Sequence, residues 1–365
     1  MKLSDRDWKE FFLEDLFVVK AGKRLTNANK IDGKRPFVGA TDNMNGVTGF
    51  VDNTNNSLDK NVLGVNYNGA PCICFYHPYE CIFTDDVKRL HLKKHEDNAY
   101  VFLFMKSIIM QQKNKYNYGY KFNERRMLRQ LLLVPVDDND EPDYQFMEDY
   151  MKELMVAKRK QYQEYVEQRL AELGIDAKKK TKVRGYNLDL ESKEWKPCKL
   201  SKLGIVKSGK DIYAMERVEG DIPYVTSGSQ NNGIGYFVAN KNQTLDKGYI
   251  AFNRNGAVGL AFYHPYWSVM GNDCRKIHIS KADENIYVGF FISTAISMQS
   301  KSFSYSRKLG TARANKLQVM LPIDDNDEPD YEFMEECGRK MMAKKYIQYL
   351  KYLDFVCESS DLLLK

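Results

Sequence analysis

One acidic segment occurs twice in this chain, and this repeat constrains the fold more than any other feature. The segment Asp-Asp-Asn-Asp-Glu-Pro-Asp-Tyr-x-Phe-Met-Glu runs from Asp137 to Glu148 and returns 187 residues later, from Asp324 to Glu335. Solenoids and propellers repeat every ~20–50 residues, so this unit is far too long to be one of their repeats. The chain must therefore fold as two copies of one domain-sized architecture.

The same offset of 187 residues aligns landmarks across both halves, with a slip of one residue near Gly49. A single register that holds over the whole of each half identifies a tandem duplication. The aligned pairs are Trp8 and Trp195, Pro36 and Pro223, residues 45–46 and 232–233, residues 68–70 and 255–257, and residues 75–79 and 262–266.

The composition is that of a folded protein with two domains. A chain of 365 residues has room for two cores, and its 43% hydrophobic and 13% aromatic residues argue against disorder. No apolar run approaches the length of a membrane span, and the first residues lack the apolar stretch of a signal peptide. We therefore expect a cytoplasmic protein without a membrane partner. The formal charge of +6 permits a nucleic-acid partner.

Cysteine and histidine do not form a ligand pattern. The seven cysteines are odd in number and scattered, and the five histidines show no ligand-like spacing to them. We expect reduced thiols in the core rather than a disulfide framework, and neither a metal site nor a cofactor.

A long helix is predicted at the end of the first copy. Residues 8–135 show short apolar runs broken by Gly, Asn, Asp and Pro, which is typical of strands and turns, with residues 101–115 as the best helix. At Glu141, acidic residues and a proline mark a helix start, and Gly174 marks its end. A helix over residues 143–173 would be about 46 Å long.

The second copy ends in the same way, because apolar residues recur by three and four between Met342 and Val356. Each long helix could pack on its own domain, or the two could pair. We favour antiparallel pairing, because the rod exceeds the radius of gyration of a domain of ~135 residues, which is about 14 Å. The pair would relate the domains by a pseudo-twofold axis.

The expected parts of this α+β chain are a domain at 1–140, a helix at 141–174, a basic linker at 175–194, a second domain at 195–327, a second helix at 328–358 and a tail at 359–365.

No constellation typical of an enzyme stands out. The chain lacks a Walker lysine motif, a Gly-rich strand-to-helix turn with a ribose-binding acid, and the Asn-Pro-Pro-Tyr tetrad of amino-methyltransferases. Asp86 and Lys88 have the spacing of a nuclease metal-site fragment, but their counterparts are Asp273 and Arg275, so one copy has lost the lysine. A buried or paired Asp86 is the favoured interpretation, and we propose no catalytic residue.

Two polar loops recur in each copy and differ in sequence, while the frame around them repeats. One is rich in Asn and Gly, at 41–45 and 226–232, and the other is basic and rich in Tyr, at 116–126 and 304–313. Arg and Lys donate to phosphate and guanine, and Asn and Gln can pair with adenine. The alternative is that Asn and Gly simply form turns. The candidate DNA-binding residues are Asn43, Asn45, Lys121, Arg125, Arg126, Ser227, Ser229, Gln230, Asn231, Arg254, Arg307, Lys308 and Arg313.

These residues make nearly the whole chain similar to the DNA specificity subunits of type I restriction-modification systems, and to the related subunits of type IIB systems. The resemblance rests on motifs that occur in the same order in both copies. They are Trp-Lys followed by Val-Lys-x-Gly-Lys, the Asn-Gly-Ala and Tyr-His-Pro-Tyr segments, the run at 223–236, and Tyr-Ser-Arg-Lys at 305–308.

The resemblance implies two target recognition domains of mixed α and β structure, separated by two long helices that pack antiparallel as a coiled-coil spacer. The resemblance also implies that the chain binds no cofactor and catalyses no reaction. The implied partners are a bipartite site on double-stranded DNA, two adenine-methyltransferase subunits, and restriction subunits in the full system. The helix start at 140–144 departs from the Pro-x-x-Glu-Gln pattern of many type I subunits, which leaves type I and type IIB-like systems both open.

Two other functions remain to be weighed. The chain could be a duplicated protein-interaction adaptor whose long helices form the docking surface, or a degenerate enzyme, which the missing constellations make the least favoured. DNA affinity that falls steeply with salt would separate a DNA-binding subunit from an adaptor.

Overall fold

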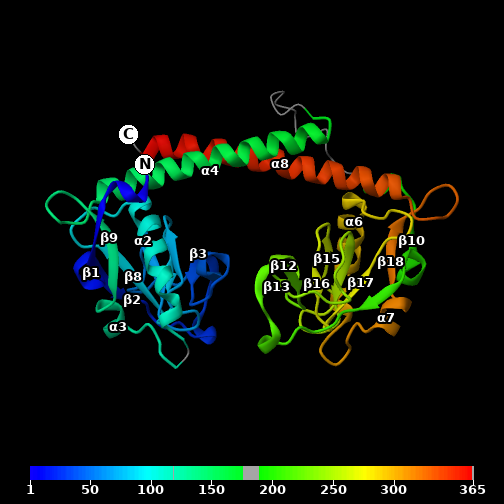
Figure 1. Ribbon diagram of the computed structural model, residues 1–365, viewed down its shortest axis with the longest axis horizontal. Helices are drawn as coiled ribbons and strands as arrows, with labels where there is room; N and C mark the ends of the chain where they lie inside the picture. Colours follow the sequence, from blue (N-terminus) through cyan, green and yellow to red (C-terminus); the bar gives the residue numbers. More distant parts are fainter. Residues whose placement is uncertain (118, 176–188, 364–365) are drawn as a thin grey trace. The chain divides into compact units, whose positions relative to one another are not determined.

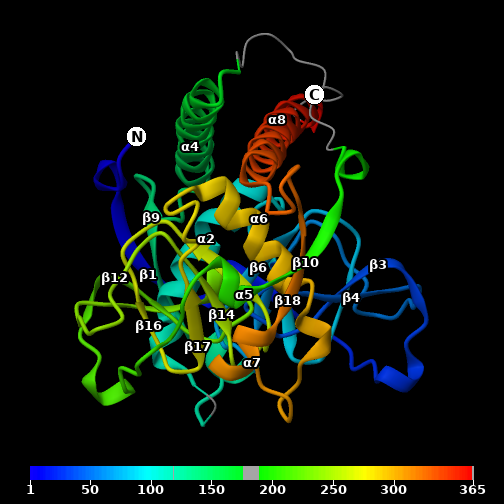
Figure 2. The same ribbon diagram turned by 90° about the vertical axis from the view of Figure 1, so that its right-hand side faces the viewer.

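The computed structural model describes residues 1–117, 119–175 and 189–363. The chain divides into two compact units, Met1–Tyr162 and Gln163–Lys365, and Figures 1 and 2 label the elements of each. None of the helices in the described residues combines the length and the apolar character needed to span a membrane.

Unit 1 is built from short strands, with the helix α2 packed on one sheet. Among its described residues the strands pair in the orders β2-β8-β5-β6, β4-β3-β7 and β1-β9. Neighbouring strands are antiparallel except β3 and β7, which are parallel. The bounds are β1 Asp7–Phe12, α1 Leu13–Leu16, β2 Phe17–Ala21, β3 Asp32–Val38, β4 Val47–Val51, β5 Val62–Asn66, β6 Cys74–His77, β7 Ile82–Phe83, β8 Val87–Leu92, α2 Ala99–Gln111, α3 Glu124–Leu128 and β9 Leu131–Val136, with single turns of 3-10 helix at η1 Leu3–Asp5, η2 Asn27–Asn29, η3 Met44–Gly46 and η4 Gln112–Lys115.

The core of unit 1 lies between α2 and the sheet that contains β5 and β8. Asn98 caps α2, because its side-chain oxygen accepts hydrogen bonds from the backbone N–H groups of Tyr100 and Val101. Phe102 of α2 is fully buried in the same cluster as Leu63 of β5. Burial of such a side chain contributes about 1.5–3 kcal/mol, so packing holds this helix on the sheet.

Unit 2 repeats this architecture strand for strand. Its described strands pair in the orders β11-β17-β14-β15, β13-β12-β16 and β10-β18. The registers also match, since Tyr224 pairs with Val269 as Phe37 pairs with Ile82. The bounds are β10 Trp195–Lys199, α5 Leu200–Leu203, β11 Val206–Ser208, β12 Glu219–Val225, β13 Ile234–Val238, β14 Tyr249–Asn253, β15 Ala261–His264, β16 Val269–Met270, β17 Cys274–Ile277, α6 Ile286–Ser297, α7 Thr311–Lys316 and β18 Gln318–Pro322, with 3-10 turns at η6 Leu190–Ser192, η7 Ala214–Glu216, η8 Asn231–Gly233 and η9 Ser300–Ser302.

An identical joint connects the last strand of each unit to its long helix. In unit 1 the Asp137 carboxylate accepts hydrogen bonds from the backbone N–H groups of Asn139 at 2.9 Å and Glu141 at 3.1 Å. Asp143 then caps the helix by accepting from the Phe146 N–H at 2.8 Å. The equivalent bonds of unit 2 join Asp324 to Asn326 and Glu328, and Asp330 to Phe333. The joint therefore uses two carboxylates of each acidic segment, the first to hold the turn and the second to cap the helix.

The long helices start later than the sequence predicts. The first, α4, spans Tyr144–Glu172, and the second, α8, spans Tyr331–Leu363. The start shifts because Asp143 is the cap, so Pro142 lies before the helix in a bridge to Val136. At the other end, α8 continues through residues expected as a tail after 358, a stretch without Gly or Pro. Most of the expected basic linker lies outside the described residues.

The last turns of α4, from residue 163 onward, belong to unit 2 and lie against α8. The rings of Tyr165 and Tyr346 stack edge to face with centroids 6.3 Å apart. In the same turns Val166 and Leu170 are fully buried. The apolar stripe of α4 is therefore covered within unit 2 at its carboxyl end.

The described cysteines are free thiols, and most lie in the interior. Five are buried and Cys198 is partly buried, which agrees with the expectation of core thiols. The buried ones are Cys72, Cys74, Cys81, Cys274 and Cys337.

Candidate nucleic-acid interface

A strained turn forms the tip of the Asn- and Gly-rich loop in each unit. Met44, Asn45 and Gly46 all have positive φ, at 50°, 53° and 76°. At residues 231–233 the values are 50°, 56° and 75°. A left-handed backbone costs about 1–2 kcal/mol for most residues and less for Asn, so Met44 is the residue of these turns that most needs local restraints.

The asparagine in the middle of this turn supplies the restraint. The Asn45 side-chain amide donates to the carbonyl oxygen of Tyr76 at 3.3 Å and to the hydroxyl of Tyr79 at 3.0 Å. In unit 2 the amide of Asn232 makes the same two bonds, at 3.2 and 2.9 Å. At Asn45 the structure therefore favours the interpretation that asparagine forms a turn, because its side-chain N–H groups donate to residues of the same unit and not to a base.

The side chains just before this asparagine also face solvent at the tip. Asn43 is exposed, and its side-chain amide donates to the neighbouring Asp42 at 2.9 Å. Met44 is 77% exposed. In unit 2 the tip residues Ser229, Gln230 and Asn231 are exposed, while Ser227 is partly buried. Met44 is not among the residues predicted from the sequence to bind DNA, because its side chain has no strong hydrogen-bond donor or acceptor. The offset of 187 nevertheless aligns it with the candidate Asn231.

The basic loop is braced in the same way in both units. Arg126 donates to the carbonyl oxygen of Lys121 at 2.8 Å, and its guanidinium lies 3.7 Å from the ring centre of Tyr120. Arg313 donates to the carbonyl oxygen of Lys308, also at 2.8 Å. Both arginines therefore shape the loop with part of their donor set. Figure 1 shows the loops before α3 and α7 at the end of each unit that lies away from its long helix.

The remaining basic candidates are distributed around this loop. Arg307 is exposed, and the Lys308 ammonium lies 4.7 Å from the ring centre of Tyr305, which is 78% exposed. In unit 1 Arg125 is exposed and lines a surface hollow together with Arg129 and two glutamates. An exposed aromatic ring beside lysine offers both stacking and charge to a nucleic acid.

Residues 253–259, which include the Asn-Gly-Ala segment, border the Asn- and Gly-rich loop of unit 2. The Asn253 amide donates to the carbonyl oxygen of Gly228 at 2.9 Å, and the Ala257 N–H donates to that of Ser227 at 3.1 Å. On its other side Gly259 approaches Ser300 so closely that an added Cβ would lie 2.8 Å from the Ser300 Cα. Residues 253–259 therefore contact the Asn- and Gly-rich loop on one side and η9, which precedes the basic loop, on the other.

A cation lies under the basic loop in each unit, with a different partner. Lys88 is buried and pairs with Glu124 at 2.6 Å. Its counterpart Arg275 donates instead to the hydroxyl of Thr311 at 2.8 Å. Burial, followed by the nearby charge of Arg254, lowers the pKa of Arg275 from its ordinary value. The region beneath the basic loop is thus more positive in unit 2 than in unit 1, and positive charge suits a phosphate contact.

The acid that resembled part of a nuclease site is paired, as expected. Asp86 accepts a hydrogen bond from the Asn68 amide at 3.0 Å, while Lys88 points to Glu124. Among the described residues, no group of three or more His, Cys, Asp and Glu side chains could hold a metal ion.

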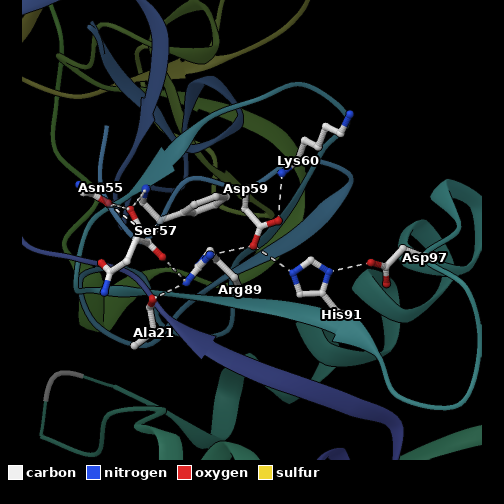
Figure 3. Close-up of polar contacts among 10 residues, drawn as sticks. Ala21, Asn55, Ser57, Asp59, Lys60, Arg89, His91 and Asp97 are labelled. Carbon is white, nitrogen blue, oxygen red and sulfur yellow. Dashed lines mark hydrogen bonds and ion pairs between the residues drawn. The ribbon is translucent and has the colours of Figure 1, made fainter. Parts of the chain in front are cut away.

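A polar network in each unit ties the sheet to the segment before the next helix, and Figure 3 shows the network of unit 1. Arg89 donates to Asp59 at 2.8 Å, and the His91 ring lies between Asp59 at 3.0 Å and Asp97 at 2.7 Å. The corresponding network of unit 2 joins Asp246, Lys276, His278 and Asp283, although Asp283 aligns with Glu96 and not with Asp97. This network belongs to the repeated frame, so it does not distinguish the two units.

Two matches to one domain family cover most of the chain. The sequence model of the type I restriction modification DNA specificity domain matches residues 5–164 and 192–350. The chain belongs to this family. The expected resemblance to specificity subunits is confirmed, and the two matches correspond to the two copies of the duplication. The curated relative is likewise a specificity subunit.

Known specificity subunits resemble this one to different extents. The specificity subunit S.BcgI of the type II restriction enzyme BgcI from Heyndrickxia coagulans is 53% identical over 149 residues, which is 41% of this chain and 44% of that protein. The match therefore spans less than half of this curated relative. The type I S subunit from M. genitalium covers 100% of this chain and 97% of its own, at 18% identity and a TM-score of 0.48. The HsdS subunit from Thermoanaerobacter tengcongensis covers 95% and 91%, at 11% identity and a TM-score of 0.33.

Proposed function

We propose that this specificity subunit reads a bipartite site on double-stranded DNA, with one half-site for each unit, and recruits methyltransferase subunits to it. Restriction subunits join in the full system. One observation carries the proposal: a frame repeated strand for strand presents the same two loops twice, with different exposed side chains at their tips. A repeated fold whose exposed loop residues differ between the two units suits the recognition of two different base sequences.

The chemistry of the loops supports this division of labour. Lys121, Arg307 and Lys308 come from loops that offer positive charge to phosphates, which position a protein on DNA. The tip residues of the Asn- and Gly-rich loops carry amide and apolar side chains, which can read base edges in the major groove.

The long helices act as the spacer between the two half-sites. At 29 residues, α4 is about 44 Å long, and one turn of duplex DNA is about 34–36 Å. The contact of Tyr165 with Tyr346 supports pairing of α4 with α8. In the proposed spacer the two helices pair antiparallel, and because each helix leaves its domain through an identical joint, such a pair would have a pseudo-twofold axis.

Methylation of genomic DNA tests the proposal directly. Cells that express this chain with its neighbouring methyltransferase should carry a bipartite adenine-methylated motif, mapped at single-base resolution, and the motif should vanish when the chain is omitted. If no motif appears while the methyltransferase works with another specificity subunit, the adaptor function is favoured instead.

Substitutions in the basic loops test whether the halves act independently. Arg307→Ala with Lys308→Ala should weaken selection of one half-site by about tenfold or more, since each lost phosphate or base contact contributes on the order of 1–3 kcal/mol. Lys121→Ala with Arg125→Ala should affect the other half-site alone. Loss of both half-sites from either pair would contradict independent recognition.

A further inference from the structure

The Phe-Tyr-His-Pro-Tyr motif at residues 75–79 connects the strained turn of unit 1 to the core. The Tyr79 hydroxyl accepts the hydrogen bond from the Asn45 amide at 3.0 Å and lies 3.4 Å from Nδ1 of His77. His77 is fully buried, with its ring edge-on to Phe83 at 5.3 Å. The exposed turn is therefore linked through one tyrosine to a rigid part of the domain.

Unit 2 contains the same chain of contacts. The Tyr266 hydroxyl accepts from the Asn232 amide at 2.9 Å and lies 3.2 Å from Nδ1 of the fully buried His264. Each of these distances is within 0.2 Å of its counterpart in unit 1. The support for the turn is thus constant between the units, and the side chain that the turn presents is not.

The presented side chain sits at the first left-handed residue, which is Met44 in unit 1 and Asn231 in unit 2. Methionine is unfavourable there for two reasons: it has a left-handed backbone that bulky residues avoid, and it leaves 77% of an apolar side chain in water. Costs of this kind concentrate at binding sites, where a held conformation is part of the function.

We propose that Met44 and Asn231 are specificity-determining residues that contact base edges, and that Tyr79 and Tyr266 are positioning residues that hold them in place. The proposal rests on DNA recognition by the two units. An exposed thioether can pack against the methyl group of thymine, whereas an asparagine amide can pair with adenine through one donor and one acceptor. The two units would then prefer different bases at equivalent positions of their half-sites.

Exchange of the two tip residues tests the reading role. The complex of this chain with its methyltransferase carries Met44→Asn in one variant and Asn231→Met in the other, and the methylated motif is mapped for each. Each variant should change base preference by about tenfold at one position of one half-site, as expected for a bidentate contact. An unchanged preference at every position, with the wild-type motif present, overturns this role and leaves the proposed function intact.

Removal of one hydroxyl tests the positioning role. Tyr79→Phe should broaden the preference of the first half-site at the position read by Met44, and Tyr266→Phe should do so for the second half-site, so each variant is the matched control of the other. A tyrosine that only stabilises the fold would lower the unfolding midpoint without a change in base preference, and that result overturns the positioning role. Absence of any wild-type motif would contradict the proposed function itself.

Discussion

At the scale of single residues, two buried histidines set how the domains respond to acid. Burial, followed by the nearby charge of Lys106, lowers the pKa of His77 to about 4, and burial alone lowers that of His264 to about 4. Both rings are fully inaccessible to solvent. A proton taken up by either ring would place an uncompensated charge in the core.

Acidification should therefore destabilise both units. An unfolded histidine binds a proton near pH 6.5, but these rings do so only near pH 4, so the unfolded state binds more protons between these values. The stabilisation that each neutral histidine gives the folded state is fully present above the unfolded pKa. It is lost as the pH drops through this window, which lowers the free energy of unfolding by about 3 kcal/mol for each histidine. Urea unfolding of His77→Gln at neutral and acidic pH should show a flatter dependence in one transition only. His264→Gln is the reciprocal control, and a His77→Gln slope equal to that of wild type would contradict the assignment.

Residue types alone could locate the recognition loops but could not tell which side chains face outward. Asn45 has the amide expected of a base-reading residue, yet the amide holds the turn onto Tyr79. Met44 has no polar group, and it occupies the exposed tip. The difference depends on backbone dihedral angles, because the left-handed turn brings the amide of its middle residue within hydrogen-bond distance of the Tyr79 hydroxyl. No count of donors and acceptors contains that information.

At the scale of elements, the joint between strand and long helix fixes where the helix begins. Proline and acidic residues predict a start near Glu141, whereas the helix begins at Tyr144. They do not show that Asp143 is the cap, because a carboxylate can serve either in the first turn or at the cap. The bond from the Phe146 N–H at 2.8 Å decides between these.

Loss of the cap should weaken this joint. Asp143→Ala removes the hydrogen bond to Phe146 and the partly buried ion pair with Arg6 at 2.7 Å, so we expect a loss of about 1–2 kcal/mol in the free energy of unfolding. Asp330→Ala should cost a similar amount in unit 2. The control is Asp138→Ala, an exposed acid in the same segment, which should change stability by less than about 0.5 kcal/mol. Equal effects of Asp143→Ala and Asp138→Ala in urea titrations would refute the capping role.

At the scale of the whole molecule, the internal repeat predicted two units with one topology before any element was placed. The repeat could not predict the pairing of the long helices, because a single apolar stripe on each helix fits a partner helix or the domain surface equally well. Val166 and Leu170 are buried beside α8 within unit 2. This burial supports the spacer proposal, in which helix length sets the distance between the half-sites.

A change in helix length tests the spacer with the recognition loops left intact. Insertion of one heptad into α4 and one at the equivalent position of α8 lengthens each helix by about 10 Å and keeps its apolar face within roughly 20° of its original direction. Because a DNA turn of about 34–36 Å contains about 10 base pairs, the unread gap of the methylated motif should grow by about three base pairs. Both half-site sequences should stay the same, since the loops that read them are unchanged. In the matched control, the inserted heptad sequence replaces an existing heptad of each helix, so the helix length stays constant. The methylated motif of this control should equal that of wild type. A lengthened variant that is folded and active but keeps the original gap would show that the helices do not measure the distance.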